Sequence, residues 1–236
     1  MIIKKNFIFA NLITLASLFC AFYSVSEVFN NNLIGAIYLI LLAFLFDGLD
    51  GKVARLLHST SDFGKELDSL VDAISFGVAP AFLFYNYLNL YNLKFGFVLP
   101  FLYVSCVILR LARFNIISSN ISKKYFIGLP CPAATIGLIS VIYLQLKNYN
   151  INNLYLILVI CLLSMLMISN IYYFSFKNLE IIVRRKFKII VPSIFVILVI
   201  SLHEPIILFS LIFLYIASGP ARSAIVKLKQ ANNHLQ

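Results

Sequence analysis

Charge is scarce in this 236-residue sequence, since only 12% of its residues are Asp, Glu, Lys or Arg. Soluble domains carry about 25% charged residues. Half that fraction leaves too little polar surface to coat a water-soluble globule. Hydrophobic residues make up 61% of the chain, and they recur in runs long enough to cross a bilayer. This composition argues against a soluble protein and indicates a chain whose solvent is mostly lipid.

Cysteine is also scarce, and the four cysteines are scattered without a C-x-x-C pair. Neither a disulfide framework nor a zinc site is therefore predicted. Acidic residues number only nine against 19 Lys and Arg, which gives a net charge of +10. Because the basic residues flank apolar runs, this excess indicates membrane topology and contact with anionic lipid head groups, and no nucleic-acid partner is expected.

The apolar runs predict an all-α, polytopic transmembrane helical bundle of about eight spans. The predicted spans cover residues 8–28, 33–57, 67–90, 94–114, 132–147, 153–174, 188–203 and 205–221. The last two are short, so a tight hairpin and one broken span both remain open for them. The first run is interpreted as a retained span and not as a cleaved signal. A single membrane domain is expected over residues 1–236.

The loop charges predict an orientation. With the N-terminus in the cytoplasm, eight spans place every basic residue except Lys94 and Lys147 on the cytoplasmic side. Such an asymmetry is the positive-inside pattern. We therefore expect both termini in the cytoplasm and a location in an inner (cell) membrane of bacterial type.

Every aspartate of the chain lies between residues 47 and 72. Asp47 and Asp50 end the second predicted span, and Asp68 and Asp72 begin the third. A carboxylate costs about 2.5–3.5 kcal/mol at a bilayer centre, and clustered carboxylates also repel one another. They therefore need a bound cation or a hydrated cavity, and oxygen ligands in this number suit Mg²⁺, Mn²⁺ or Ca²⁺.

Helical spacing gathers small residues beside these acids. At about 100° per residue, Gly51, Ala54 and Arg55 share a face with Asp47 and Asp50. Gly64, Ser75 and Ala79 lie on the stripe of the i,i+4 pair formed by the other two acids. Small side chains would let a bulky phosphate approach the backbone, and the arginine would complement its charge.

Residues 47–72 read DGLDGKVARLLHSTSDFGKELDSLVD and fill every fixed position of D-x-x-D-G-x-x-A-R-x8-G-x-x-x-D-x-x-x-D. This segment resembles the signature of the CDP-alcohol phosphatidyltransferase family. Asn11 and Thr14 are similar to the N-x-x-T of the family's first span, although Ala10 stands where the family usually has proline. RLARFN (residues 110–115) and GLPCPAA (residues 128–134) resemble the family branch that uses serine as acceptor.

The resemblance implies a six-helix family core with two further spans and an active site on the cytoplasmic side. It implies transfer of the phosphatidyl group from CDP-diacylglycerol to the hydroxyl of L-serine by direct displacement, with release of CMP. Asp47, Asp50, Asp68 and Asp72 would hold two Mg²⁺ or Mn²⁺ ions, with Asp72 also the general base. The CDP-lipid contacts would come from Asn11, Thr14, Gly51, Ala54, Arg55, Ser61 and Gly64.

A serine acceptor brings a carboxylate that needs a cation. Arg110 and Arg113 are candidates for this role, and Asn115 could add a hydrogen bond. Topology-setting charge is the alternative reading of both arginines. The aspartate signature does not separate serine from glycerol 3-phosphate, inositol phosphate or an archaeal-type lipid donor. A cation transporter is the remaining alternative, but it predicts acids spread through the membrane depth. We also expect membrane lipids as partners and a homodimer.

Overall fold

The computed structural model describes residues 5–57, 61–90, 96–117, 125–149, 152–174 and 205–233. Its contacts divide the chain into two compact units, Met1–Leu111 and Ala112–Gln236. The first contains α1 (Lys5–Phe29), α2 (Leu33–Leu56), α3 (Asp62–Asp72), the π-helix η1 (Ala73–Val78), α4 (Ala79–Leu90) and most of α5 (Val98–Ile117). The second contains β1 (Tyr125–Ile127), α6 (Cys131–Leu146), α7 (Asn153–Ile168), β2 (Tyr172–Phe174) and α10 (Pro205–Asn233).

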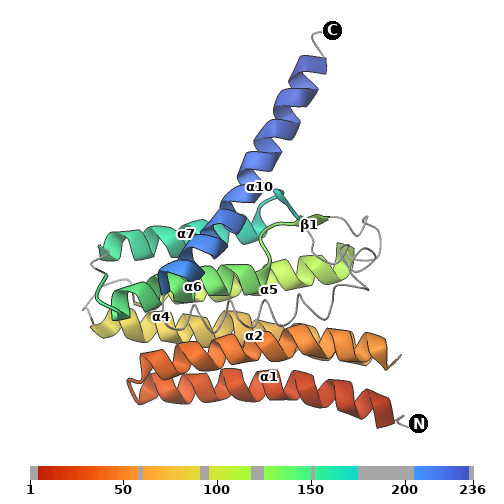
Figure 1. The fold of residues 1–236 in the computed structure, drawn as a ribbon, viewed down its shortest axis with the longest axis vertical. Coiled ribbons are helices and arrows are strands. Elements are labelled where there is room, and N and C mark those ends of the chain that lie inside the picture. Colours follow the sequence, from red (N-terminus) through yellow and green to blue (C-terminus); the bar gives the residue numbers. More distant parts are fainter. Residues whose placement is uncertain are drawn as a thin grey trace. The chain divides into compact units, whose positions relative to one another are not determined.

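Helices α1 and α2 form an antiparallel hairpin and lie side by side along their length (Figure 1). The turn between them uses Asn31 at φ 58°, a left-handed conformation that asparagine tolerates better than most residues. Asn32 then caps α2, because its side-chain oxygen accepts from the N–H of Gly35 at 3.1 Å. The hairpin returns the C-terminal end of α2 to the level at which α1 begins.

Among the residues that the structure describes, four helical segments are long and apolar enough to cross a membrane: Ile8–Phe29, Leu33–Leu56, Asp62–Asn89 and Val98–Ile116. Shorter apolar helices cover Cys131–Leu146, Leu154–Ile168 and Pro205–Ala221. These helices fit the predicted helical membrane bundle. The predicted span 188–203 lies outside the described residues, so the count of eight spans and the orientation stay predictions.

The predicted span 153–174 is wrong at its C-terminal end. Helix α7 stops at Ile168, and the following residues form β2, which pairs antiparallel with β1 in the register Tyr125↔Phe174 and Ile127↔Tyr172. A hydropathy pattern counts the aromatic residues of β2 as apolar without distinguishing strand from helix. The small sheet is also a local departure from the all-α prediction.

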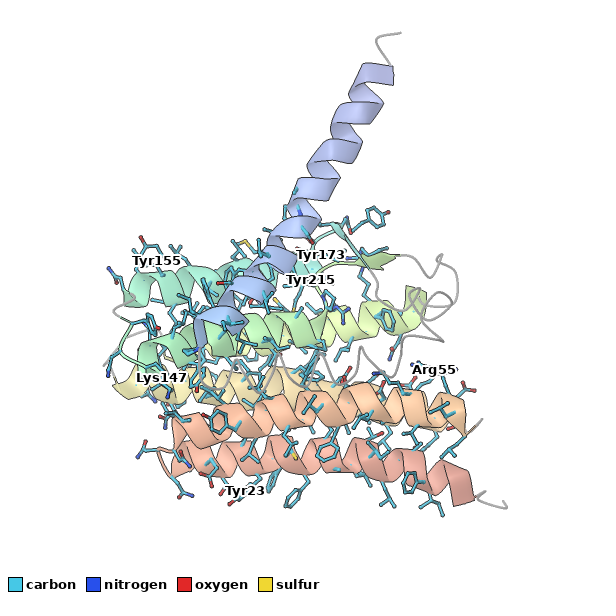
Figure 2. The ribbon with its side chains drawn as sticks, viewed as in Figure 1. Tyr23, Arg55, Lys147, Tyr155, Tyr173 and Tyr215 are labelled. Atoms are coloured by element: carbon cyan, nitrogen blue, oxygen red, sulfur yellow. The ribbon has the colours of Figure 1, made fainter. Side chains whose placement is uncertain are left out.

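In the second unit, α6 packs on α7 and α10, and β2 contacts α10. Pro220 lies inside α10 and has no N–H, so it leaves the carbonyl of Ile216 without its helical donor. The hydroxyl of Tyr173 on β2 donates to that carbonyl at 3.3 Å. Figure 2 shows Tyr173 beside Tyr215 of α10, with ring centroids 5.9 Å apart. A side chain at Gly219 would overlap the Tyr173 ring, so glycine permits this contact.

Burial raises the pKa of Tyr173 to about 12, with a smaller contribution from Tyr215, so the phenol stays protonated at neutral pH and can donate. We expect Tyr173→Phe to destabilise the protein by about 1 kcal/mol, the usual worth of one hydrogen bond. In a Pro220→Ala background the loss is expected to shrink, because the restored N–H can bond Ile216. Thermal unfolding in detergent of the two single variants and the double variant checks this. An equal loss of stability from Tyr173→Phe in both backgrounds would show that the tyrosine hydroxyl does not compensate for Pro220.

Candidate active site

The carboxylates of the first unit converge where α2 ends and α3 begins. Asp47, Asp50 and Asp68 each offer a carboxylate oxygen, and these oxygens lie within 4.8 Å of one another. Asp50 is buried, and the other two are half-buried. The Oδ2 atom of Asp50 is buried and makes no hydrogen bond to any residue that the structure describes. A buried carboxylate oxygen of this kind needs a cation or a donor.

Asp72 completes the cluster from the last turn of α3. Its carboxyl group lies near those of Asp47, Asp68 and Asp50. The structure thus brings together all four acids that the sequence selected. An oxygen-only donor set that includes an unsatisfied buried oxygen fits a hard divalent cation such as Mg²⁺ or Mn²⁺. The acidic group can therefore hold a metal ion.

The helix that carries Asp72 changes type directly after it. Residues Ala73–Val78 form a π-helix, in which the N–H of Ala79 bonds the carbonyl of Ile74. Proline at position 80 has no N–H and its ring crowds the carbonyl of Phe76, which disfavours regular α-helical bonding at this point. Single π-turns often occur at functional sites, and this one sets where the segment after Asp72 points.

Helix α1 brings Asn11 and Thr14 to the cluster. The Thr14 hydroxyl lies 3.3 Å from the carbonyl of Ala10 and is also within hydrogen-bonding reach of the Asp50 carboxylate. Its single proton can go to either acceptor. Asn11 approaches α3 closely, because a Cβ added at Gly64 would lie 3.5 Å from its Oδ1 atom. Both residues therefore lie at the acidic end of the first unit.

The small residues on α2 leave open space beside the acids. A Cβ added at Gly51 would meet only the guanidinium of Arg55, at 3.8 Å. Arg55 is exposed near the C-terminal end of α2, as Figure 2 shows, and its charge acts on Asp50. Ala54 is half-buried on the same helix. This arrangement provides room and positive charge for an anionic ligand next to the carboxylates.

Ser61 has a structural role that its motif position did not predict. It is the N-cap of α3, and its hydroxyl oxygen accepts from the N–H of Gly64 at 3.0 Å. Its own proton is still available to a ligand. The cap fixes where α3 starts and therefore which face its acids present.

The residues predicted to hold the acceptor differ in their surroundings. Arg110 is buried, whereas Asn115 is exposed. Arg113 donates to the carbonyls of Ile168, at 3.0 Å, and Ser169, at 3.5 Å, and also bonds the side chain of Asn170. Its guanidinium thus caps the C-terminal end of α7, as cations commonly do. The binding of serine by these residues stays a prediction.

A comparison with known protein families decides the relationship. The sequence pattern described as CDP-alcohol phosphatidyltransferase matches residues 7–169, which is more than half of the chain. The chain belongs to the CDP-alcohol phosphatidyltransferase family. The matched stretch runs from α1 to the end of α7 and includes all four acids, so the family resemblance read from residues 47–72 is confirmed.

Curated relatives in the family carry one name. The chain is 40% identical over 184 residues to a CDP-diacylglycerol--serine O-phosphatidyltransferase of Helicobacter pylori, which covers 75% of this chain and 76% of the relative. It is 43% identical over 147 residues to a protein of the same name from Methanocaldococcus jannaschii (62% and 67%). A third, from Bacillus subtilis, is 35% identical over 168 residues (71% and 90%).

The pairing of Ser17 with Ser75 was not predicted from the sequence, which placed only Ser75 near the acids. Ser17 and Ser75 are buried at the point where α1 and η1 meet α2. Each lies three residues along the chain from a predicted site residue, Thr14 or Asp72. That spacing is visible in the sequence, but isolated serines in spans are common, and only the three-dimensional contacts distinguish this pair.

Proposed function

We propose that this chain transfers the phosphatidyl group from CDP-diacylglycerol to the hydroxyl of L-serine, giving phosphatidylserine and CMP. The observation that carries the proposal is the convergence of Asp47, Asp50, Asp68 and Asp72 beside open space at Gly51. The names of the relatives from three organisms support serine as the acceptor.

In this proposal the four aspartates hold two divalent cations, Mg²⁺ or Mn²⁺. When bound, such ions supply positive charge to the diphosphate and to the CMP that leaves. The buried, unsatisfied Oδ2 of Asp50 supports this assignment, since a carboxylate oxygen kept from water without a donor is otherwise costly.

The remaining residues bind and orient the CDP-lipid. Arg55, exposed at the end of α2, complements a phosphate oxygen, and Gly51 with Ala54 lets the diphosphate approach the helix. Asn11 and Thr14 lie at the same end and are proposed to contact the nucleotide. The Ser61 hydroxyl accepts the N–H of Gly64 and does not use its own proton in the helix cap. We propose that it donates this proton to a phosphate oxygen.

Asp72 is the proposed general base. A serine hydroxyl is a weak nucleophile and needs a positioned proton acceptor. In the displacement, the serine oxygen forms a bond to the β-phosphorus while the bond from that phosphorus to the CMP oxygen breaks. The hydroxyl proton moves to a carboxylate oxygen of Asp72, and CMP departs with the electron pair. The atoms of donor and acceptor are all recovered in phosphatidylserine, CMP and one proton.

Other acceptors are the competing form of the same chemistry, since the aspartate signature serves any alcohol. The test is an acceptor screen with purified protein, CDP-diacylglycerol and Mn²⁺. We expect CMP release with L-serine to exceed that with glycerol 3-phosphate or inositol phosphate by at least about tenfold, the gain from one well-placed interaction. Equal or faster release with another acceptor would reassign the substrate.

The selectivity for serine is proposed to rest on the cations of α5. Arg110→Ala is expected to raise the KM for serine by at least about tenfold with little change in the KM for CDP-diacylglycerol, because a buried cation that pairs a carboxylate is costly to lose. The effect of Arg113→Ala should also include the loss of a structural contact, because its guanidinium donates to the carbonyl at the end of α7. Steady-state kinetics with each substrate varied separately makes the comparison. An unchanged serine KM in both variants would place the carboxylate elsewhere.

The active site is proposed to face the cytoplasm across an inner (cell) membrane, and the protein is proposed to be a homodimer. Eight spans put Asn31, between α1 and α2, outside and Asn232 inside. Single cysteines at these positions, in a background without Cys161, should react with an impermeant maleimide from opposite sides of the membrane. The native Cys20, Cys106 and Cys131 are buried. Labelling of both positions from one side would refute the orientation.

A further inference from the structure

A buried polar junction between α1, α2 and η1 lies about one helical turn from the acids. The Ser17 hydroxyl of α1 donates to the carbonyl of Ala43 on α2 at 2.9 Å. The Ser17 and Ser75 hydroxyl oxygens lie 3.5 Å apart, and both side chains are buried. A hydroxyl has one proton. Because Ser17 gives its proton to Ala43, Ser75 is the donor in any hydrogen bond between the two serines.

The junction is in register with the site. Thr14 precedes Ser17 by three residues on α1, Asp47 follows Ala43 by four on α2, and Asp72 precedes Ser75 by three. Residues three or four apart lie on one face of a helix. The carbonyl of Ala43 is moreover the one that accepts the N–H of Asp47 in a regular α-helix. The three helices are therefore bonded together directly beneath the residues that they contribute.

Other buried serines in the described part of the chain bond their own helix. Ser24, two turns after Ser17 on α1, donates to the carbonyl of Ala21 at 2.6 Å. Ser140 and Ser164 likewise donate to carbonyls three and four residues earlier. Such local bonds are the default for a serine in a membrane helix, because hydrocarbon offers no water as partner. Ser17 instead crosses to another helix.

We propose that Ser17 and Ser75 are positioning residues that set the spacing of α1, α2 and the α3–η1 segment, so that the four aspartates can hold divalent cations. The inference rests on the metal site of the proposed function. Neither serine is a catalytic residue, since each acts through the helix that carries a site residue. Losing the junction should weaken metal binding while all ligand groups remain.

The test compares Ser17→Ala and Ser75→Ala with Ser24→Ala, a matched control of equal burial on α1. Direct Mn²⁺ titration by electron paramagnetic resonance, without substrate, gives the Kd. The Mg²⁺ concentration for half-maximal CMP release is the second measurement. Interhelical hydrogen bonds in membrane proteins are worth enough to predict a rise of about 3- to 20-fold in both quantities for Ser17→Ala. Ser24→Ala should change neither.

Saturating metal provides a further distinction, because it should restore most of the Ser17→Ala rate when every ligand is still present. If Ser17→Ala does not fold, Ser75→Ala, which removes only one hydroxyl bond, carries the test. Equal Mn²⁺ affinity in Ser17→Ala, Ser75→Ala and wild type would overturn the proposal. So would an equal loss in Ser24→Ala. A wild-type protein that binds no Mn²⁺ would instead overturn the metal site, and the inference with it.

Discussion

Replacing Asp72 by asparagine is expected to lower the rate of CMP release by about 10²–10⁴-fold, the usual contribution of a general base. Asparagine keeps the size of the side chain and one oxygen ligand, but it cannot accept the serine proton at neutral pH. The carboxylates of Asp47, Asp50 and Asp68 are unchanged in this variant, so most of the metal site remains. CDP-diacylglycerol and metal are therefore expected still to bind.

Asp47→Asn provides the contrast. It removes charge from one of the three carboxylates whose oxygens lie within 4.8 Å, so it should weaken Mn²⁺ and nucleotide binding directly. Nucleotide affinity and single-turnover rate, measured for both variants, separate the two effects. An Asp72→Asn enzyme that turns over serine near the wild-type rate would remove Asp72 as the base.

Removal of divalent cations is expected to abolish CMP release. Four clustered carboxylates repel one another, and the buried Oδ2 of Asp50 has no donor among the described residues. Without a cation the diphosphate would add further negative charge to this group. Chelation with EDTA followed by Mg²⁺ or Mn²⁺ should eliminate and then restore the activity.

Asp62 supplies a matched control for this experiment. It lies in the first turn of α3, is exposed and pairs with Lys65 at 2.8 Å, outside the acidic cluster. Asp62→Asn should keep the wild-type metal dependence, whereas Asp50→Asn should require much more metal. Full activity in excess EDTA, with no metal bound to the protein, would contradict the site assignment.

The grouping of the site acids could be predicted from spacing alone. Asp47 with Asp50, and Asp68 with Asp72, lie within one turn on their helices, and a fixed 3.6-residue period converts spacing into a shared face. The energetic cost of acids in a membrane then requires the two pairs to meet around a cation or in a hydrated cavity. The family resemblance implied that Asn11 and Gly64 both contact the CDP-lipid, but their proximity in the structure follows from no local sequence pattern.

Other features could not be predicted because they depend on contacts between distant residues. Arg113 looked like a cation for serine, but it caps a helix that ends 55 residues later, at Ile168. The early end of α7 follows from strand pairing with β1, which hydropathy does not detect. The interhelical bond of Ser17 depends on the approach of α2, 26 residues away.

The measurement that tests the central claim most directly is the product balance of the purified protein with CDP-diacylglycerol, Mn²⁺ and L-serine labelled with ¹⁸O in its hydroxyl. Direct displacement predicts one phosphatidylserine for each CMP, with the label retained in the phosphate ester. It also predicts that almost no CMP forms when serine is absent. CMP release at the same rate without serine, or label missing from the lipid, would contradict the account.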